Sequence, residues 1–144
     1  MPRIDLELRK RVLSDIKPDP VVESRDSAQV SLNYEMPLGG GTFSIKGASS
    51  GATTQTLGAL TLSANTSSQI VLDPNNGTSN TLILGNAWTR NIGSSLLIDY
   101  SSANSGTRVV QTAAATTTYT LTNGIYGGIL VKDSAGVTGF ATRA

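Results

Sequence analysis

Short stretches in which apolar and polar residues alternate, separated by turn-forming residues, fill the chain from about residue 42 onwards. Phe43 and Ile45 fall on one face of such a stretch, and Tyr119 and Leu121 share a face further along. Alternation with a period of two predicts β-strands that bury one face. We expect nine strands: Thr42–Lys46, Gln55–Ser63, Gln69–Asp73, Thr81–Leu84, Ser95–Tyr100, Thr107–Thr112, Thr116–Thr122, Ile125–Lys132 and Val137–Thr142.

Clusters of Gly, Asn, Ser and Pro lie between the expected strands, as in Asp73-Pro74-Asn75-Asn76-Gly77. They favour turns because Gly and Asn accept positive φ and Pro fixes φ. Continuous apolar runs such as Ile70-Val71-Leu72 and Leu96-Leu97-Ile98 predict strands covered on both faces. The pattern predicts an all-β fold, either a short-strand β-solenoid or a β-sandwich or jelly-roll-like domain.

The first 36 residues have a different composition from the rest of the 144-residue chain. They hold 13 of the 21 charged residues and neither Gly nor Thr, whereas the remainder holds all 15 Gly and all 18 Thr. A change of this size indicates a boundary. We expect a charged N-terminal arm over residues 1–36, a Gly hinge over 37–41 and a β-domain over 42–144.

Two periodicities overlap in the arm. Its apolar residues first alternate with charged ones, which suits a strand, and then recur at a spacing of four, which suits a helix. We favour a short helix that ends before Lys17-Pro18, because Pro disfavours a helical residue before it, and then an extended connector at Asp19–Val22. The arm is either a flexible tail or, as we favour, a segment that packs on a neighbouring subunit through Ile4, Leu6, Leu8, Val12, Leu13 and Ile16.

Composition excludes several kinds of chemistry. The chain has no Cys and no His, so thiolate catalysis, disulfides and His-based triads or metal sites are absent. A net charge of +1 without a basic stripe argues against nucleic acid, and no apolar run approaches the ~18 residues of a membrane span. We expect no enzymatic activity and no cofactor or metal, since Asp73, Asp99 and Asp133, the acids after Glu35, all fall at predicted turns or strand ends.

Other features have both a structural and a functional interpretation. The oxygen-rich loop Asp73–Thr78 does not have EF-hand spacing, and a turn explains it. Trp88, Tyr100 and Tyr126 are candidates for stacking on sugar rings, although aromatic residues more often anchor a core or an interface. The start of the chain lacks the apolar region and small-residue cleavage site of a signal peptide.

Three segments carry a resemblance to a known family. They are Gly39–Gly47 followed by Gln55–Leu62, then Thr81–Gly85 running into Trp88–Ser94, and finally Thr122–Gly128 with Gly139–Thr142. In this order they resemble the autotransporter-associated β-strand repeats of large secreted bacterial surface proteins, over roughly residues 39–142. The resemblance implies an extended, solenoid-like β-structure with a non-enzymatic surface role and transfers no functional residue. The family's members are long, exported proteins with many repeats, unlike this chain.

Together these features predict a structural subunit of an extracellular particle. Our first expectation is a phage virion component, either a capsid decoration protein or part of a fibre or spike. It would form a homo-oligomer, with a trimer as one form, and contact other structural proteins of the particle. The alternatives are a bacterial surface stalk or adhesin fragment and a carbohydrate-binding module that takes surface glycans. The expected location is the virion or an extracellular surface.

Overall fold

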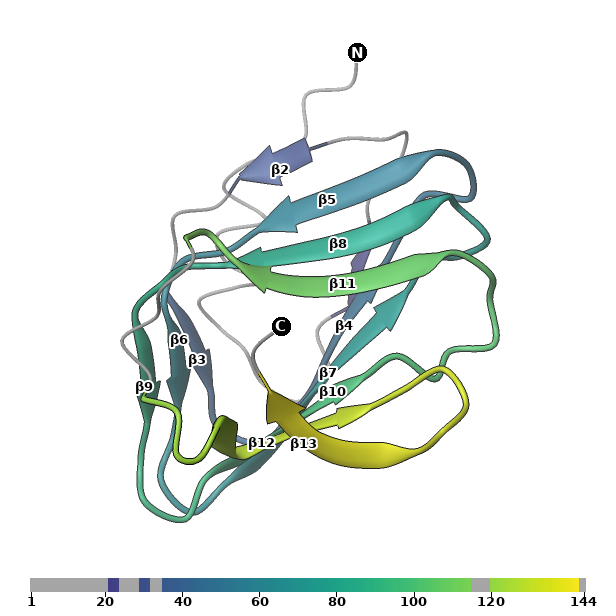
Figure 1. Ribbon diagram of the computed structural model, residues 1–144. Helices are drawn as coiled ribbons and strands as arrows, with labels where there is room; N and C mark the ends of the chain where they lie inside the picture. The colour runs from purple at the N-terminus through teal and green to yellow at the C-terminus, as the bar shows by residue number, and fades with distance from the viewer. Residues whose placement is uncertain (1–20, 24–28, 32–34, 115–119, 143–144) are drawn as a thin grey trace.

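The computed structural model describes residues 21–23, 29–31, 35–114 and 120–142 (Figure 1). In these residues the chain forms thirteen strands and no helix. The strands are β1 (Val21–Glu23), β2 (Gln29–Ser31), β3 (Met36–Leu38), β4 (Gly41–Lys46), β5 (Ala52–Thr56), β6 (Leu60–Leu62), β7 (Ser67–Asp73), β8 (Ser79–Leu84), β9 (Trp88–Arg90), β10 (Ser95–Asp99), β11 (Thr107–Thr112), β12 (Ile125–Lys132) and β13 (Thr138–Thr142).

The strands form three sheets, and successive strands enter the sheets in rotation. Sheet A has the order β1-β4-β7-β10-β12-β13, sheet B the order β11-β8-β5-β2 and sheet C the order β3-β6-β9. Figure 1 shows the three sheets as sides around a common interior. From β1 to β8, each strand therefore pairs with the strand that follows three places later in the chain.

Strand pairing is parallel everywhere in the described residues except between β12 and β13. In sheet A, Phe43 pairs with Ile70, and Ile70 in turn pairs with Ile98. The step along the chain is therefore nearly constant, and each step is one turn through the three sheets. β13 reverses direction and pairs antiparallel with β12.

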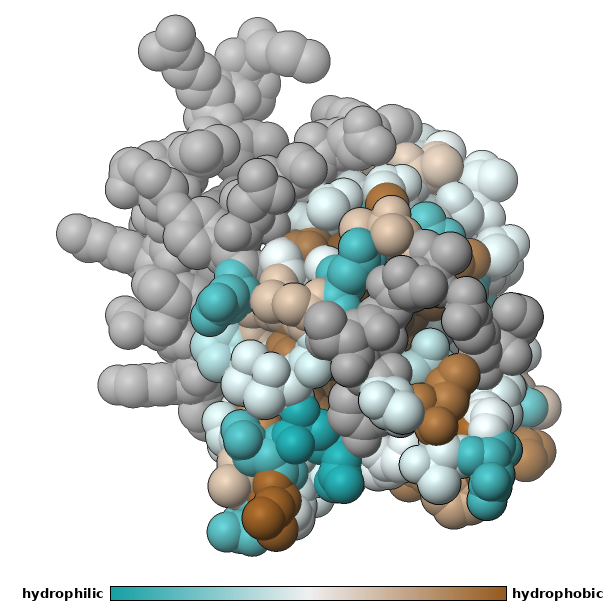
Figure 2. All heavy atoms as spheres, turned by 60° about the vertical axis from the view of Figure 1, so that its left-hand side comes forward, coloured by the Kyte–Doolittle hydropathy of each residue, from teal (hydrophilic) through white to brown (hydrophobic). Residues whose placement is uncertain are grey.

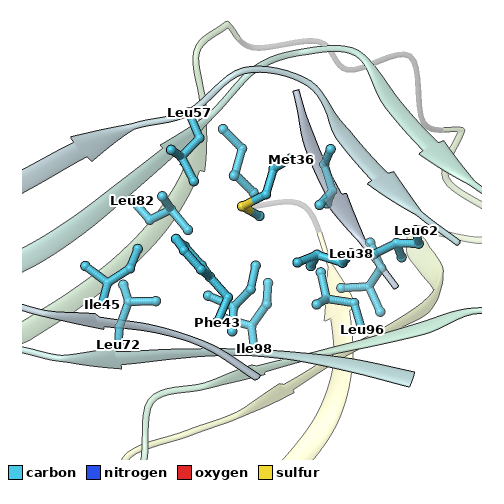
Figure 3. Packing of buried hydrophobic residues seen from close by; sticks show 14 of the residues in the cluster. Met36, Leu38, Phe43, Ile45, Leu57, Leu62, Leu72, Leu82, Leu96 and Ile98 are labelled. Carbon is cyan, nitrogen blue, oxygen red and sulfur yellow. The ribbon is translucent and has the colours of Figure 1, made fainter. Parts of the chain in front are cut away.

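Alternate side chains of each sheet point into one hydrophobic interior. β4, β7 and β8 show a strict alternation of buried and half-buried residues along most of their length. Figure 3 shows Met36, Phe43 and Leu82, from sheets C, A and B, pointing into the same space. Each of these side chains is at most 2% exposed.

The expectation that the apolar runs are covered on both faces is wrong. In Ile70-Val71-Leu72, the first and third residues are buried and Val71 is half-buried, and Leu97 is half-buried in the same way. The reason is geometric: each sheet has one face toward the common interior and the other toward solvent. On the face shown in Figure 2, hydrophobic atoms outside the grey regions form small separate groups among polar ones.

The expected strands from residue 41 onwards correspond closely to those observed, with two differences. The predicted strand Gln55–Ser63 is two strands, β5 and β6, because the chain turns a corner between Thr56 and Leu60. The predicted strand Thr116–Thr122 falls partly outside the described residues, and its described part has a single bridge between Thr122 and Ile125.

The sequence pattern missed β1, β2, β3 and β9, each of which has only three residues. β1, β2 and β3 pair with β4, β5 and β6, so strand pairing continues across the expected hinge at 37–41. The functional division between residues 1–36 and the rest stays a prediction. The expected helix and all six arm anchors fall within residues 1–20, outside the described residues.

The corners between strands stack on one another in successive turns. Gly85 donates its N–H to the Gly58 carbonyl at 2.9 Å, and a Cβ at Gly85 would lie 2.7 Å from the Gly58 carbonyl carbon. Asn side chains also connect neighbouring turns: Asn75 donates to the Gly47 carbonyl at 3.1 Å and Asn91 to the Leu62 carbonyl at 2.9 Å. Small and amide residues recur at corners because these contacts need close approach and extra donors.

Candidate functional site

The three aromatic residues that the sequence singled out line one cavity. Trp88 lies in β9, Tyr100 directly follows β10, and Tyr126 lies in β12. The Trp88 and Tyr126 rings have their centroids 6.0 Å apart and are tilted by 38°. Parallel winding brings these side chains together from β9, β12 and the residue after β10. The cavity has a volume of about 450 Å³, within the range of small-molecule and side-chain pockets.

Aliphatic side chains supply most of the remaining wall. Ile98 comes from β10, Val110 from β11, and Ile129 and Val131 from β12. Ala141 of β13 closes one side. The polar residues in the lining are Gln111, Thr112 and Thr142. A cavity with these walls is suited to an apolar group.

Tyr100 ties sheet A to sheet B at this cavity. Its hydroxyl oxygen accepts a hydrogen bond from the Val110 N–H at 3.0 Å. Burial raises the pKa of the Tyr100 phenol, and the hydrogen bond from Val110 opposes part of that effect. The phenol is therefore neutral at physiological pH. Its hydroxyl oxygen accepts a hydrogen bond from the backbone of β11, the last strand of sheet B.

Trp88 is also held by a hydrogen bond, because its indole N–H donates to the Gly85 carbonyl at 2.6 Å. Within sheet C, Trp88 pairs with Leu60, so it occupies the position that Leu60 has one turn earlier. Arg90 similarly occupies the position of Leu62 and donates to the Ser94 carbonyl at 2.9 Å. The last turn of sheet C therefore carries large side chains with polar ends where the previous turn has leucine.

A second polar cluster surrounds the corner at Ser101–Gly106. The Arg108 guanidinium donates to the carbonyls of Ser102 and Gly106, each at 2.8 Å, and also to that of Asn104. Asn104 in turn donates to the Asp73 carboxylate at 2.8 and 3.0 Å. These contacts hold one corner against the corner of the previous turn, which is a structural task.

The three acids of the β-domain all bind backbone or neighbouring side chains. Asp73 accepts the Asn75 N–H at 2.8 Å, and Asn75 and Asn76 have φ of 53° and 66°, so the segment that could be mistaken for a calcium loop is a turn. Asp133 accepts two backbone N–H groups, each at 2.9 Å. In the described residues no group of three or more acidic side chains converges as a metal site would require.

Asp99, at the end of β10, has a carboxyl with a perturbed pKa. Burial alone would raise the pKa of Asp99, but hydrogen bonds from Ser101 and the charge of Lys132 outweigh it and hold that pKa below its usual value. The Lys132 ammonium lies 3.6 Å from the Asp99 carboxylate. The Gln69 side-chain amide donates a hydrogen bond to the same carboxylate at 2.9 Å. Asp99 thus bridges β7, β10 and β12 of sheet A.

Comparison with known proteins gives no match: no protein family, no curated protein and no solved structure matches this chain. Over the residues that the structure describes, there is no helix long and apolar enough to cross a membrane.

Proposed function

We propose that this chain is a non-enzymatic structural subunit of an extracellular particle, built on a short β-solenoid. The observation that carries the proposal is the parallel pairing of each strand with its counterpart one turn later. Such a stack is a rigid body held by backbone ladders and by contacts between corners. The use of Asp73, Asp99 and Asp133 as acceptors within turns also supports a structural role.

Parallel pairing favours a solenoid over a β-sandwich or jelly roll. Sandwiches and jelly rolls are built from antiparallel strands, whereas nine of the ten described strand pairings here are parallel. The nearly constant step from Phe43 to Ile70 to Ile98 in sheet A corresponds to one solenoid turn.

The particle that we propose first is a phage virion, in which the chain serves as a capsid decoration protein or as part of a fibre or spike. The charged, apolar-patterned segment over residues 1–20 supports an assembly role, because it offers Ile4, Leu6 and Leu8 between charged neighbours. A bacterial surface stalk is the alternative, and the resemblance over residues 39–142 favours it. Both place the chain at a virion or extracellular surface.

Light scattering after size exclusion, combined with small-angle scattering on the full-length chain, tests the proposal. A closed oligomer, such as a trimer, supports the virion subunit. An elongated monomer at every concentration would instead favour the stalk. Truncation before residue 37, suggested by composition alone, is a poor test because it removes β1 and β2 and cuts into β3; full-length variants are preferable.

Carbohydrate binding is a second candidate, since Trp88, Tyr100 and Tyr126 line one cavity. Sugar sites combine aromatic faces with several polar groups, and here the Trp88 N–H and the Tyr100 hydroxyl already form internal hydrogen bonds. The aliphatic wall favours an apolar occupant. A glycan array with Trp88→Ala as control tests the point, and absence of glycan binding by the wild-type chain would remove this candidate.

A further inference from the structure

Among the residues that the structure describes, sheet A ends in an unpaired edge. β13 is its last strand, and no described strand pairs with the other side of β13. Its sequence, Thr138-Gly139-Phe140-Ala141-Thr142, has neither a charge nor a proline, the devices that proteins use to block edge pairing. Phe140 is 65% exposed. A free, uncharged edge with an exposed aromatic residue is a template for another strand.

The edge adjoins the cavity. Ala141 and Thr142 form part of its wall, and Val110 and Thr112 of β11 contribute from sheet B. Figure 1 shows β11 and β13 as the last strands of their sheets on the same side of the molecule. A strand added beside β13 would extend sheet A toward β11. One of its faces would then point into the cavity and the other toward solvent.

The occupant must therefore be an extended segment with alternating apolar and polar residues. Residues 3–9 have this pattern, because Ile4, Leu6 and Leu8 alternate with Arg3, Asp5, Glu7 and Arg9. In a strand, the three apolar side chains would share one face and the four charged ones the other. This matches an apolar cavity on one side and water on the other.

Strand order indicates which copy supplies the segment. β1 and β13 lie at opposite ends of the six-stranded sheet A, about 24 Å apart at the usual strand spacing of ~4.8 Å. Residues 10–20 could cross this distance at ~3.3 Å per residue, but they would have to run along the whole of sheet A to do so. When two copies stack end to end along sheet A, the segment that precedes β1 starts beside the β13 edge of the neighbour.

We propose that residues 3–9 of one copy add as a strand to the β13 edge of a second copy, with Ile4, Leu6 and Leu8 filling the cavity. This proposal rests on the proposed structural function and specifies how the subunits join. The contact is head-to-tail, so repetition produces either a ring or an open filament. Backbone hydrogen bonds supply affinity, and the cavity supplies selectivity for the alternating apolar residues.

Trp88 provides a direct readout, because it is the only tryptophan of the chain and lines the cavity. A synthetic peptide of residues 1–12, added to full-length protein at a concentration that keeps it dissociated, should change the emission of Trp88 with saturation. The same peptide carrying Leu6→Asp should bind at least tenfold more weakly, whereas one carrying Glu7→Lys should bind about as well. Equal binding of all three peptides, or of none, would overturn the proposal.

Assembly of the full-length chain gives the second readout. Leu6→Asp and Phe140→Lys should each weaken association at least tenfold in light scattering, while Glu7→Lys and Val137→Lys, which change charge off the cavity face and outside β13, should not. Circular dichroism checks that each variant retains the wild-type β-structure. Oligomers that persist unchanged in Leu6→Asp and Phe140→Lys would overturn this contact but leave the structural function standing. A chain that is monomeric at every concentration would overturn both this contact and the virion subunit, and would favour the surface stalk.

Cross-linking separates contact between copies from contact within one. Since the chain lacks cysteine, a single-cysteine variant Glu7→Cys can be mixed with Thr138→Cys and treated with a short thiol-reactive cross-linker. A product of twice the chain mass that contains one copy of each variant is expected. Replacing Thr138→Cys by Ala52→Cys, at the exposed start of β5, should abolish that product. Cross-linking only within the double variant Glu7→Cys/Thr138→Cys, and never between chains, would overturn the role of a second copy.

Discussion

Substitution of Gly85 by alanine tests the stacking of turns most directly. The Gly85 backbone is not in the left-handed region, so the substitution introduces no conformational strain of that kind. The added Cβ would instead lie 2.7 Å from the Gly58 carbonyl carbon, 2.8 Å from its oxygen and 2.9 Å from the Ala59 nitrogen. All three atoms belong to the backbone of the previous turn, which cannot rotate away.

We expect Gly85→Ala to lower the free energy of unfolding by about 1–3 kcal/mol, the usual cost of overpacking a close contact. Gly39→Ala is the matched control, because its nearest neighbour within 4 Å is the Ser63 hydroxyl at 3.8 Å, an ordinary contact. That variant should be neutral or slightly stabilised, since alanine restricts the unfolded chain.

Urea denaturation followed by circular dichroism measures both variants, with the slope of the transition checked for constancy. The comparison isolates contact between turns, because both substitutions add the same methyl group outside the strands. If Gly85→Ala is as stable as the wild type and as Gly39→Ala, then the corners at residues 58 and 85 do not lie against each other. The parallel winding in this part of the fold would then be refuted.

Three further substitutions probe individual hydrogen bonds in the same denaturation assay. Tyr100→Phe removes the acceptor of the Val110 N–H and should cost about 1 kcal/mol; an unchanged midpoint would contradict the bond. Asn80→Ala should cost about 2 kcal/mol or more, because the fully buried Asn80 amide donates to two backbone carbonyls, each at 2.9 Å. Because the folded pKa of Asp99 is lowered, its contribution is present above pH ~4 and is lost as the pH falls through the folded pKa. Asp99→Asn should therefore be less stable than the wild type at pH 7, with a gap that shrinks below pH ~4; a gap independent of pH would contradict this.

The strand content of the fold was predictable, because it depends on local patterns. Alternation in Thr42–Lys46 and the Asn-Gly turn at Asn76-Gly77 identify strands and their ends with little reference to the rest of the chain. β1, β2, β3 and β9 were missed because each has three residues, which hold less than two full periods of alternation. β9 shows the difficulty, since Trp88–Arg90 has half-buried and exposed residues only.

Parallel pairing and the cavity could not be read from the same patterns. Alternation in a strand fits a parallel or an antiparallel neighbour equally well, and the choice depends on contacts a full turn away along the chain, such as Phe43 with Ile70. Trp88, Tyr100 and Tyr126 were recognised as a group by their chemistry. Only the register between turns places them on one cavity, with an aliphatic wall that the sequence did not indicate.

The residues of the last turn explain why the winding changes there. In sheet B the register runs from Thr53 to Asn80 to Arg108, so the side chain lengthens at each step and finally carries a charge. In sheet C, Leu60 is followed by Trp88.

A further turn stacked on these positions would have to bury a guanidinium group, and burial of an ion without a charged partner is costly. The Arg108 guanidinium is already partly buried: its Nε is buried without a hydrogen-bond partner, and its terminal nitrogens donate to the carbonyls of Ser102 and Gly106. Sheet A, whose inward residues remain aliphatic through Ile129, continues alone for two more strands. The cavity and the β13 edge lie where sheet A continues past the last described strands of sheets B and C, which favours addition of a strand there over another full turn.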